Sequence, residues 1–388
     1  MDSRNFTDAH VHDSATAGHP GACSDSPGMR LLRVQGDGAA RGKAHGEEFR
    51  DLIGEAMERW REALALREKI PTERYIGDFL SSTGFAASAK ELSPDLFAEA
   101  EGIAAGSGQP FDDVLVYNLM DEEWRYERDP NIGCSTIGTF LHDGGPHHAR
   151  AVLGQNMDLP ATMRGSQIVL QIENPDGPDQ IVLSGAGMIG LLGVNAAGVG
   201  VCVNSVRALP SAEKGLPVAF VIRELLLRTD AAAAAGYLES VPHASGQHYA
   251  IGDPTGIRGY ECSSEGCVAG PEGRQLLHTN HILWSAYEDA ANDSQHAFEA
   301  HGTHTRLTSL RNGLEQVRSF GDLQRLLSTT DNGLCVLPTP DRQVETFCAA
   351  EFVLAEPPLV RIAAGRPDQA PWQTIGWSTS RRPEGSLS

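Results

Sequence analysis

The chain has 388 residues, of which 40% are hydrophobic and 21% charged, and its formal net charge is −20. This length and composition indicate an ordinary globular protein with a substantial core, in one large domain or two medium ones. The negative charge argues against a nucleic-acid-binding role, and no apolar run is long enough to span a bilayer, so we expect neither nucleic acid nor a membrane among the partners. A negative long-range field also mildly favours a cationic or neutral substrate.

Residues 1–28 are rich in Ser, His, Gly and Asp and lack the apolar segment of a secretion signal. This composition predicts a disordered leader. The seven cysteines are scattered along the chain, which predicts a reducing, cytoplasmic setting without a disulfide framework. Six of them are interpreted as buried structural cysteines, and only Cys134 is singled out for chemistry.

The segment 29–133 is predicted to be mainly helical. It opens with a short strand at Leu31–Val34 and a turn over Gly36–Gly42. Apolar residues then recur every three or four positions, which is typical of an amphipathic helix: Phe49, Ile53, Met57, Trp60 and Leu64. Two further helices are expected at Pro94–Ala105 and Pro110–Met120.

After Cys134 the pattern changes to short apolar or alternating runs separated by turn residues, which predicts strands. The expected strands are Ala151–Leu153, Ile168–Ile172, Ile181–Leu183, a hairpin of Gly190–Val194 and Val199–Val203, Tyr249–Gly252, Gly259–Cys262, Leu276–His278, Val344–Phe347, Phe352–Leu354 and Val360–Ala363. The expected helices are Pro217–Arg228, Ala231–Leu238, Thr305–Val317 and Phe320–Leu327. Strand blocks that alternate with helix pairs indicate antiparallel sheets covered by helices.

Gly133-Cys134 has the chemistry of a self-cleavage site. Cysteine is the best nucleophile among the side chains, and it needs a base or a lowered pKa to act near neutrality. If the peptide bond before Cys134 broke, the new α-amine, with a reference pKa of about 8, would stand beside the thiol as a base. Before cleavage the same thiol could attack the Gly133 carbonyl, and glycine lets the backbone adopt the geometry of attack.

Several motifs surround Cys134 in a recurring order: Val116-Tyr117-Asn118 with Glu122, Gly133-Cys134-Ser135-Thr136, Gly154-Gln155-Asn156-Met157-Asp158, Gly193-Val194-Asn195 with Gly198, Cys202-Val203-Asn204, Leu216-Pro217, His278-Thr279-Asn280-His281, Thr305-Arg306 and Gly365-Arg366-Pro367. Together with Gly42 and Gly46 near the start, this set resembles the penicillin acyltransferase-like family of N-terminal nucleophile hydrolases. That is the cysteine peptidase branch related to the choloylglycine hydrolases. The resemblance covers most of the chain.

The resemblance implies a role for each of five residues. Cys134 would be the nucleophile, and Asp158 the carboxylate that orients and charges the new amine. Asn280 would donate to the oxyanion, Asn204 would be a second donor or a substrate contact, and Arg306 a cation near the thiolate. Elementary chemistry agrees with these roles, since amide groups are neutral donors suited to a developing oxyanion and a carboxylate holds an ammonium.

Other patterns point elsewhere. Asp8, His10 and His12 have the spacing of a metal-dependent amidohydrolase, but the polar residues before them cannot form a buried barrel strand. Gly185–Gly190 matches the dinucleotide-binding glycine pattern, yet a hairpin follows where that motif needs a helix. A binding protein with a buried Cys134 is a further alternative.

We therefore expect an α+β fold, a four-layer αββα sandwich of two antiparallel sheets, made as one precursor. Cleavage before Cys134 would leave a small subunit, from the helical pro-segment 29–133, bound to a catalytic domain of residues 134–388. The expected reaction is attack of the thiolate on an amide or acyl donor of a small N-acyl compound, through an acyl-enzyme thioester that passes to water or to an amine. No cofactor and no metal are expected.

Overall fold

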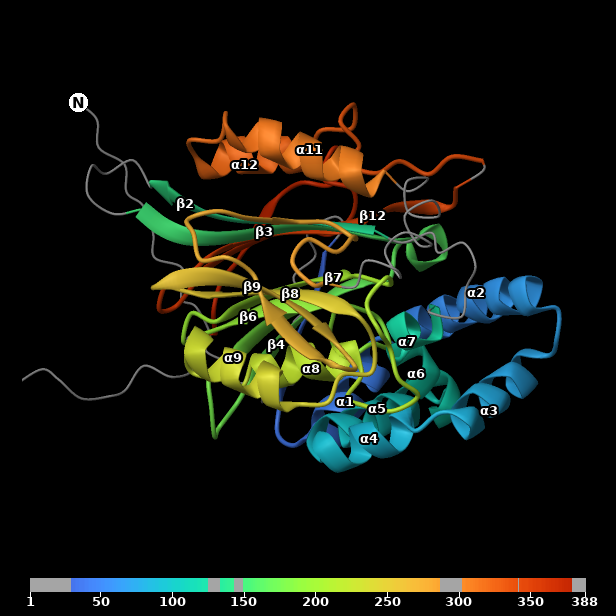
Figure 1. The fold of residues 1–388 in the computed structure, drawn as a ribbon. Helices are drawn as coiled ribbons and strands as arrows, with labels where there is room; N and C mark the ends of the chain where they lie inside the picture. Colours follow the sequence, from blue (N-terminus) through green and yellow to red (C-terminus); the bar gives the residue numbers. More distant parts are fainter. Residues whose placement is uncertain (1–28, 125–132, 143–148, 287–301, 341, 379–388) are drawn as a thin grey trace, which may run out of the picture.

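The computed structural model describes residues 29–124, 133–142, 149–286, 302–340 and 342–378. Two sheets are stacked face to face, and helices cover the outer face of each sheet (Figure 1). The expected four-layer αββα sandwich is therefore confirmed.

The segment before Gly133 is mainly helical, as predicted. Its elements are β1 (Arg30–Gln35), α1 (Gly38–Glu48), α2 (Arg50–Glu68), α3 (Thr72–Ser82), α4 (Phe85–Leu92), α5 (Pro94–Ser107), α6 (Phe111–Asn118) and α7 (Met120–Trp124). The turn predicted over Gly36–Gly42 is wrong beyond Asp37, which caps α1 by accepting from the N–H of Ala40. A Cβ on Gly42 would lie 1.9 Å from the carbonyl oxygen of Glu99, so glycine here serves close packing of α1 on α5 and not a turn.

The larger sheet has eight strands in the order β1-β4-β5-β6-β7-β8-β9-β10. Beyond β1, these are β4 (Gln167–Glu173), β5 (Gln180–Gly185), β6 (Leu192–Asn195), β7 (Gly200–Ser205), β8 (Gln247–Asp253), β9 (Gly256–Ser263) and β10 (Gly266–Ala269). The predicted β6–β7 hairpin is confirmed. The prediction of purely antiparallel sheets is wrong at one edge, where β1 pairs with β4 in parallel. A parallel neighbour needs a long crossover, and here the intervening chain includes the whole helical segment.

The smaller sheet has six antiparallel strands in the order β11-β2-β3-β12-β13-β14. They are β11 (Leu276–His278), β2 (Gly133–His142), β3 (Ala149–Pro160), β12 (Val344–Val353), β13 (Leu359–Ala363) and β14 (Gln373–Ile375). The pairing of β12 with β3 shifts register between Thr346 and Cys348. Strand β2 starts at the glycine of the predicted cleavage site and runs through the middle of the fold.

The outer layers come from different parts of the chain. Helices α11 (Thr303–Leu314) and α12 (Phe320–Leu327) cover the smaller sheet, whereas α8 (Val218–Leu225), α9 (Ala231–Ser240), α1 and α5 cover the larger one (Figure 1). The main apolar core lies within and around the larger sheet and reaches β2, β3 and β12, and a second cluster lies under α11 and α12. None of the helices in the described residues is long and apolar enough to cross a membrane.

The cysteines follow the prediction in part. Cys202, Cys335 and Cys348 are buried and unbonded, as expected of structural cysteines. Cys262 and Cys267, however, form a disulfide between directly opposed positions of β9 and β10, so the expectation that they are unpaired is wrong. Sequence spacing does not reveal this pair, because only the hairpin register brings the two side chains together.

Candidate active site at Cys134

Three adjacent strands place the first residues of the site in one row. Gly133 at the start of β2 is opposite Asp158 on β3, and Asp158 is in turn opposite Thr346 on β12. Cys134 follows Gly133 on the same strand. The long antiparallel pairing of these strands fixes the row, so neighbouring backbones hold Asp158 beside the Gly133-Cys134 bond.

Asp158 is fully buried, and only one of its carboxylate oxygens has a partner. The Thr346 hydroxyl donates to Oδ1 at 2.6 Å, whereas Oδ2 has no hydrogen-bond partner. A Cβ built on Gly133 would be 3.3 Å from this Oδ2, so the orphaned oxygen lies against Gly133. Burial raises the pKa of Asp158 to about 6, against the opposing effect of the Arg306 charge. An unpaired buried acceptor costs roughly 1–3 kcal/mol, which indicates a partner that the uncut chain does not supply.

Asn280 contacts the backbone of Cys134 directly. Its Oδ1 accepts from the N–H of Cys134 at 2.9 Å and from Nη2 of Arg306 at 2.8 Å. Its Nδ2 donates to the carbonyl of Ser205 at 3.0 Å. Two donors at one end and an acceptor at the other fix the orientation of the amide. In the uncut chain the oxygen of Asn280, rather than its nitrogen, is therefore turned to Cys134.

Arg306 reaches the site from α11, in the outer helical layer. Its guanidinium donates to the carbonyl of Cys134 and, at 3.0 Å, to the Ser135 hydroxyl. The side chain is 2% exposed, and its Nε has no partner. This arginine thus binds the carbonyl of the residue that would become the new N-terminus, and it is not among the residues that line the cavity described below.

Cys134 is 8% exposed, and its thiol forms no disulfide. Burial and the nearby carboxylates of Asp158 and Asp121 raise its pKa well above the ordinary value, against the effect of Arg306. The thiol is consequently neutral in the uncut chain, and ionisation requires a new positive charge or a base beside it. A free α-amine at this position would provide both.

Asn204 on β7 is fully buried, and it contacts Thr136 on β2 of the other sheet. Its Oδ1 accepts from the Thr136 hydroxyl at 2.8 Å and lies 2.8 Å from Nδ1 of His248, whereas its Nδ2 is buried without a partner. Thr136 is two residues from Cys134 and shares its face of β2. Asn204 is not among the residues that line the cavity.

Glu261 on β9 is a residue that the sequence analysis missed. It is 1% exposed and accepts from Nε2 of His278 and from the backbone N–H groups of Leu283, Trp284 and Ser285. Burial alone would raise the pKa of Glu261, but these hydrogen bonds hold it at about 2. Its carboxylate therefore holds the segment that carries Asn280 in place through hydrogen bonds on both sides of that residue. The sequence offered one sign of this residue, namely a charged side chain between Tyr260 and Cys262 in a predicted strand.

A cavity of about 40 Å³ opens beside Cys134. Its wall is mostly apolar and includes Met120, Trp124, Met188, Leu191, Val218 and Ile222. The polar residues of the lining are Asn118, Asp121, Asp158, Ser205, Gln247 and Asn280, of which Asp158 and Asn280 were predicted as site residues. The volume holds little more than a water molecule in the uncut chain, and Gly133 itself forms part of the wall.

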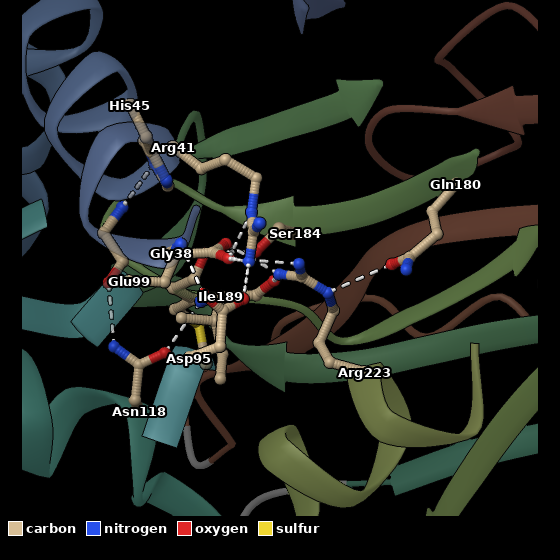
Figure 2. Close-up of polar contacts among 12 residues, drawn as sticks. Gly38, Arg41, His45, Asp95, Glu99, Asn118, Gln180, Ser184, Ile189 and Arg223 are labelled. Carbon is tan, nitrogen blue, oxygen red and sulfur yellow. Dashed lines mark hydrogen bonds and ion pairs between the residues drawn. The ribbon is translucent and has the colours of Figure 1, made fainter. Parts of the chain in front are cut away.

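Buried polar contacts hold the turn 187–190, which forms one side of the cavity (Figure 2). Asn118 bridges it by donating to the carbonyl of Gly187 and accepting from the N–H of Ile189. Arg223 donates to the carbonyl of Ile189 and is paired with Glu99 at 2.7 Å. The glycine pattern Gly185–Gly190 therefore forms a turn between two strands, as expected, and opens no helix.

The alternative metal site Asp8/His10/His12 lies outside the described residues. Within the described part of the chain, one group of potential ligands lies within 4.8 Å, namely His243, Cys262 and Cys267. Both of its sulfur atoms are bonded to one another. The group lies at the β9–β10 hairpin, and none of its members lines the cavity beside Cys134.

Comparison with known proteins finds one family. The model of the family described as acyl-coenzyme A:6-aminopenicillanic acid acyl-transferase matches residues 146–367, which is more than half of the chain. The 40 kDa form of acyl-coenzyme A:6-aminopenicillanic-acid-acyltransferase from Emericella nidulans is 26% identical over 230 residues. That match covers 58% of this chain and spans 62% of the length of the relative. The family match begins after Cys134.

Two solved structures are also similar. A mutant of the conjugated bile acid hydrolase from Clostridium perfringens is 12% identical with a TM-score of 0.35, and the match covers 63% of this chain and 97% of that protein. Penicillin V acylase from Agrobacterium tumefaciens is 14% identical with a TM-score of 0.34, and the match covers 59% of this chain and 82% of that protein.

Proposed function

Because the chain belongs to the acyl-coenzyme A:6-aminopenicillanic acid acyl-transferase family, we propose that it is a self-processing cysteine enzyme that cleaves the amide bond of a small N-acyl compound. Cys134 is its nucleophile. The observation that carries the proposal is the orphaned Oδ2 of Asp158, buried against Gly133 at the bond where a new ammonium would appear.

Maturation starts from the Cys134 thiol. Its sulfur attacks the carbonyl carbon of Gly133, the C–N bond breaks, and the proton moves to the departing nitrogen, which becomes the α-amine of Cys134. Water then opens the thioester and leaves a carboxylate on Gly133. Asn280 and Arg306 support this step, because they bind the N–H and the carbonyl of Cys134 and so hold the cysteine backbone while the preceding bond rearranges.

The mature site would use the same groups differently. The α-ammonium of Cys134 has three protons, and Oδ1 of Asn280 together with Oδ2 of Asp158 are acceptors already in place for two of them. The deprotonated amine is then the general base for the thiol, and Asp158 holds it in position. One hydrogen on Nδ2 of Asn280 is donated to the carbonyl of Ser205, and its second hydrogen is the donor for the substrate oxyanion.

Catalysis follows as acyl transfer through the thiol. The thiolate attacks the substrate carbonyl, the amine leaves with a proton from the α-ammonium, and an acyl-enzyme thioester remains. Water resolves this intermediate in hydrolysis, and a second amine resolves it in acyl transfer. Hydrolysis is the default reaction, since water is always present.

The two fragments would stay together after cleavage. Strand β1 of the small subunit is hydrogen-bonded to β4 of the large one, and the side chain of Asn118 on α6 is tied to the turn 187–190. Helix α1, α5 and the larger sheet also share one core. The interface between the fragments is therefore a domain interior, which resists dissociation.

Intact mass spectrometry of the purified protein tests the proposal. We expect two co-purifying fragments of 133 and 255 residues (388 − 133 = 255), the larger beginning at Cys134. Cys134→Ala should remain uncut and inactive, whereas Cys202→Ala, which removes another buried thiol, should mature normally.

Activity against a panel of amides and acyl donors completes the test. Iodoacetamide should abolish turnover of the mature protein by alkylating Cys134, and strong chelators should leave it unchanged. An intact single chain with full activity would refute the mechanism. Loss of activity with chelators would instead favour the Asp8/His10/His12 alternative.

A further inference from the structure

The cavity beside Cys134 is lined by two chemically different kinds of group. Its lining combines thioether, aromatic and aliphatic groups with a polar group of Asp121, Gln247 and Ser205, in which Gln247 and Ser205 donate hydrogen bonds to Asp121. Cys134 belongs to the same lining. A substrate whose carbonyl reaches the thiol therefore meets both apolar and polar groups.

Asp121 supplies a carboxylate to the polar part of this lining. It belongs to α7 and is half-buried, and it accepts from Nε2 of Gln247 at 3.3 Å and from the Ser205 hydroxyl. Its charge is close enough to Cys134 to affect the thiol. The proposed maturation and acyl transfer make no use of this carboxylate.

Gln247 on β8 adds an acceptor that nothing in the described chain satisfies. The side chain is 1% exposed, and its nitrogen donates both to Asp121 and to the hydroxyl of Ser245. These two bonds fix the amide orientation and leave Oε1 buried without a partner. A buried acceptor without a donor costs roughly 1–3 kcal/mol, so a ligand that supplies an N–H would recover that energy.

The surroundings favour a cation at this point. Among the described residues that line the cavity, none is a lysine or an arginine. The carboxylate of Glu122 is adjacent in the chain, and Arg207 is the cation whose charge acts on Asp121 from outside the cavity wall. The net charge of −20 adds a long-range field of the same sign.

Building on the proposed function, we propose that the substrate is the N-acyl derivative of an amine with a second, cationic nitrogen. That nitrogen binds between Asp121 and Oε1 of Gln247, and the apolar acyl group lies against Met188, Leu191 and Ile222. The reaction is unchanged: the thioester forms on Cys134 as the amide C–N bond breaks, and water releases the acid. The product amine leaves as a dication.

Matched amides test this inference on the mature wild-type protein. N-octanoyl-1,4-diaminobutane carries the cation, N-octanoylpentylamine replaces it with a methyl group, and N-octanoyl-5-aminopentanoate replaces it with a carboxylate. Octanoate release should give a kcat/KM about 10- to 100-fold higher for the cationic amide than for the neutral one, because hydrogen bonds to a charged group contribute about 1.5–3 kcal/mol. The anionic amide should be the poorest substrate. Equal values for the cationic and neutral amides would overturn the inference.

Two variants locate the effect. Asp121→Asn keeps the shape of the side chain and should bring the cationic-to-neutral ratio to within about threefold of unity. Asp112→Asn removes the same charge from an exposed position on α6 and should leave the ratio as in the wild type. If both variants lower the ratio equally, the preference comes from the overall field, and the binding site is refuted.

Binding separates this inference from the proposed function. Ketone analogues, in which CH₂ replaces the amide N–H, have no C–N bond to cleave, and calorimetry measures their affinity for the mature protein. Tighter binding of the cationic ketone, lost in Asp121→Asn, supports the site even if no amide is hydrolysed, in which case only the proposed function fails. Amide hydrolysis without any charge preference leaves the function standing and refutes the inference, and so does the absence of ketone binding.

Discussion

Two ionic clusters, each with buried charged residues, differ in how completely their polar atoms are paired. The cluster of Arg41, Asp95, Glu99 and Arg223 joins α1, α5 and α8 (Figure 2). Both oxygens of Glu99 bind arginine, and Arg223 also donates to Gln180 and to the carbonyl of Ile189. The cluster at Cys134 instead leaves Oδ2 of Asp158 and Nε of Arg306 unpaired.

This difference separates a structural role from a chemical one. In a fully paired ion cluster every charged group already has a partner, so removing one member lowers stability. A cluster with an orphaned carboxylate oxygen is incompletely paired, and under the proposed cleavage the new ammonium would satisfy it. The unpaired atoms therefore mark the place where we propose that the chemistry occurs. Substitutions in the paired cluster should mainly lower stability, whereas substitutions in the cluster at Cys134 should mainly lower activity.

The largest effect on stability is expected from the paired cluster. Arg223→Met leaves Glu99 with only Arg41 in a buried position and should lower the free energy of unfolding by about 3–5 kcal/mol. Urea unfolding of the single-chain Cys134→Ala background, followed by circular dichroism, measures this change. Arg228→Met breaks the more exposed pair with Glu224 and should cost about 1 kcal/mol or less.

The double variant sharpens this test. Glu99→Leu with Arg223→Met removes both charges and should cost less than Arg223→Met alone, because no buried carboxylate is left short of a partner. A single variant within about 1 kcal/mol of the background would show that the paired cluster is not the structural support described here.

Asn280 belongs to the other cluster, and its replacement should affect turnover more than folding. Asn280→Ala in matured protein should lower kcat about 10²–10³-fold, the usual loss for one oxyanion donor, while Cys134 still reacts with iodoacetamide. Asn174→Ala, at a turn between β4 and β5, is the matched amide control and should retain full turnover. Turnover within about twofold of wild type would move the oxyanion assignment to Asn204 or to backbone N–H groups.

The smallest expected effect concerns how the free energy of unfolding of the uncut chain changes with pH as Asp158 titrates. Its folded pKa is raised from 3.8 to about 6, so the folded state prefers the protonated carboxyl. The stability it contributes is present below about pH 4 and is lost as the pH rises through 6. Between pH 4 and pH 8, Cys134→Ala should therefore lose about 2–3 kcal/mol relative to Cys134→Ala/Asp158→Asn, which keeps a neutral side chain throughout.

Thermal and urea unfolding of the two variants across this pH range measure the difference. Asp121 and Glu122 also have raised pKa values, but they are common to both proteins and cancel in the comparison. A difference that is flat with pH would mean that Asp158 is paired after all, and the contrast between the two clusters would fail.

Much of the fold could be predicted from the sequence because its signals are local. The apolar runs that become β6 and β7, the three-to-four-residue repeat of apolar residues in α2, and the turn residues between strands are each recognised from neighbouring residues. The parallel placement of β1, the disulfide of Cys262 with Cys267 and the helix at Gly38 could not be predicted in this way. Each depends on which distant segment packs alongside.

The candidate site divides in the same manner. The sequence by itself singled out Cys134, Asp158, Asn280, Asn204 and Arg306, because their motifs follow one another in the order that the family resemblance implies. Only the tertiary structure decided that Asp158 keeps one oxygen unpaired and that Asn280 turns its oxygen to Cys134. It also decided that Asp121 and Gln247 line the cavity beside Cys134, and that Glu261 binds the backbone of the segment after Asn280. The physical reason is that a residue's type is local, whereas its hydrogen-bond partners and its desolvation are set by strands and helices far away in the chain.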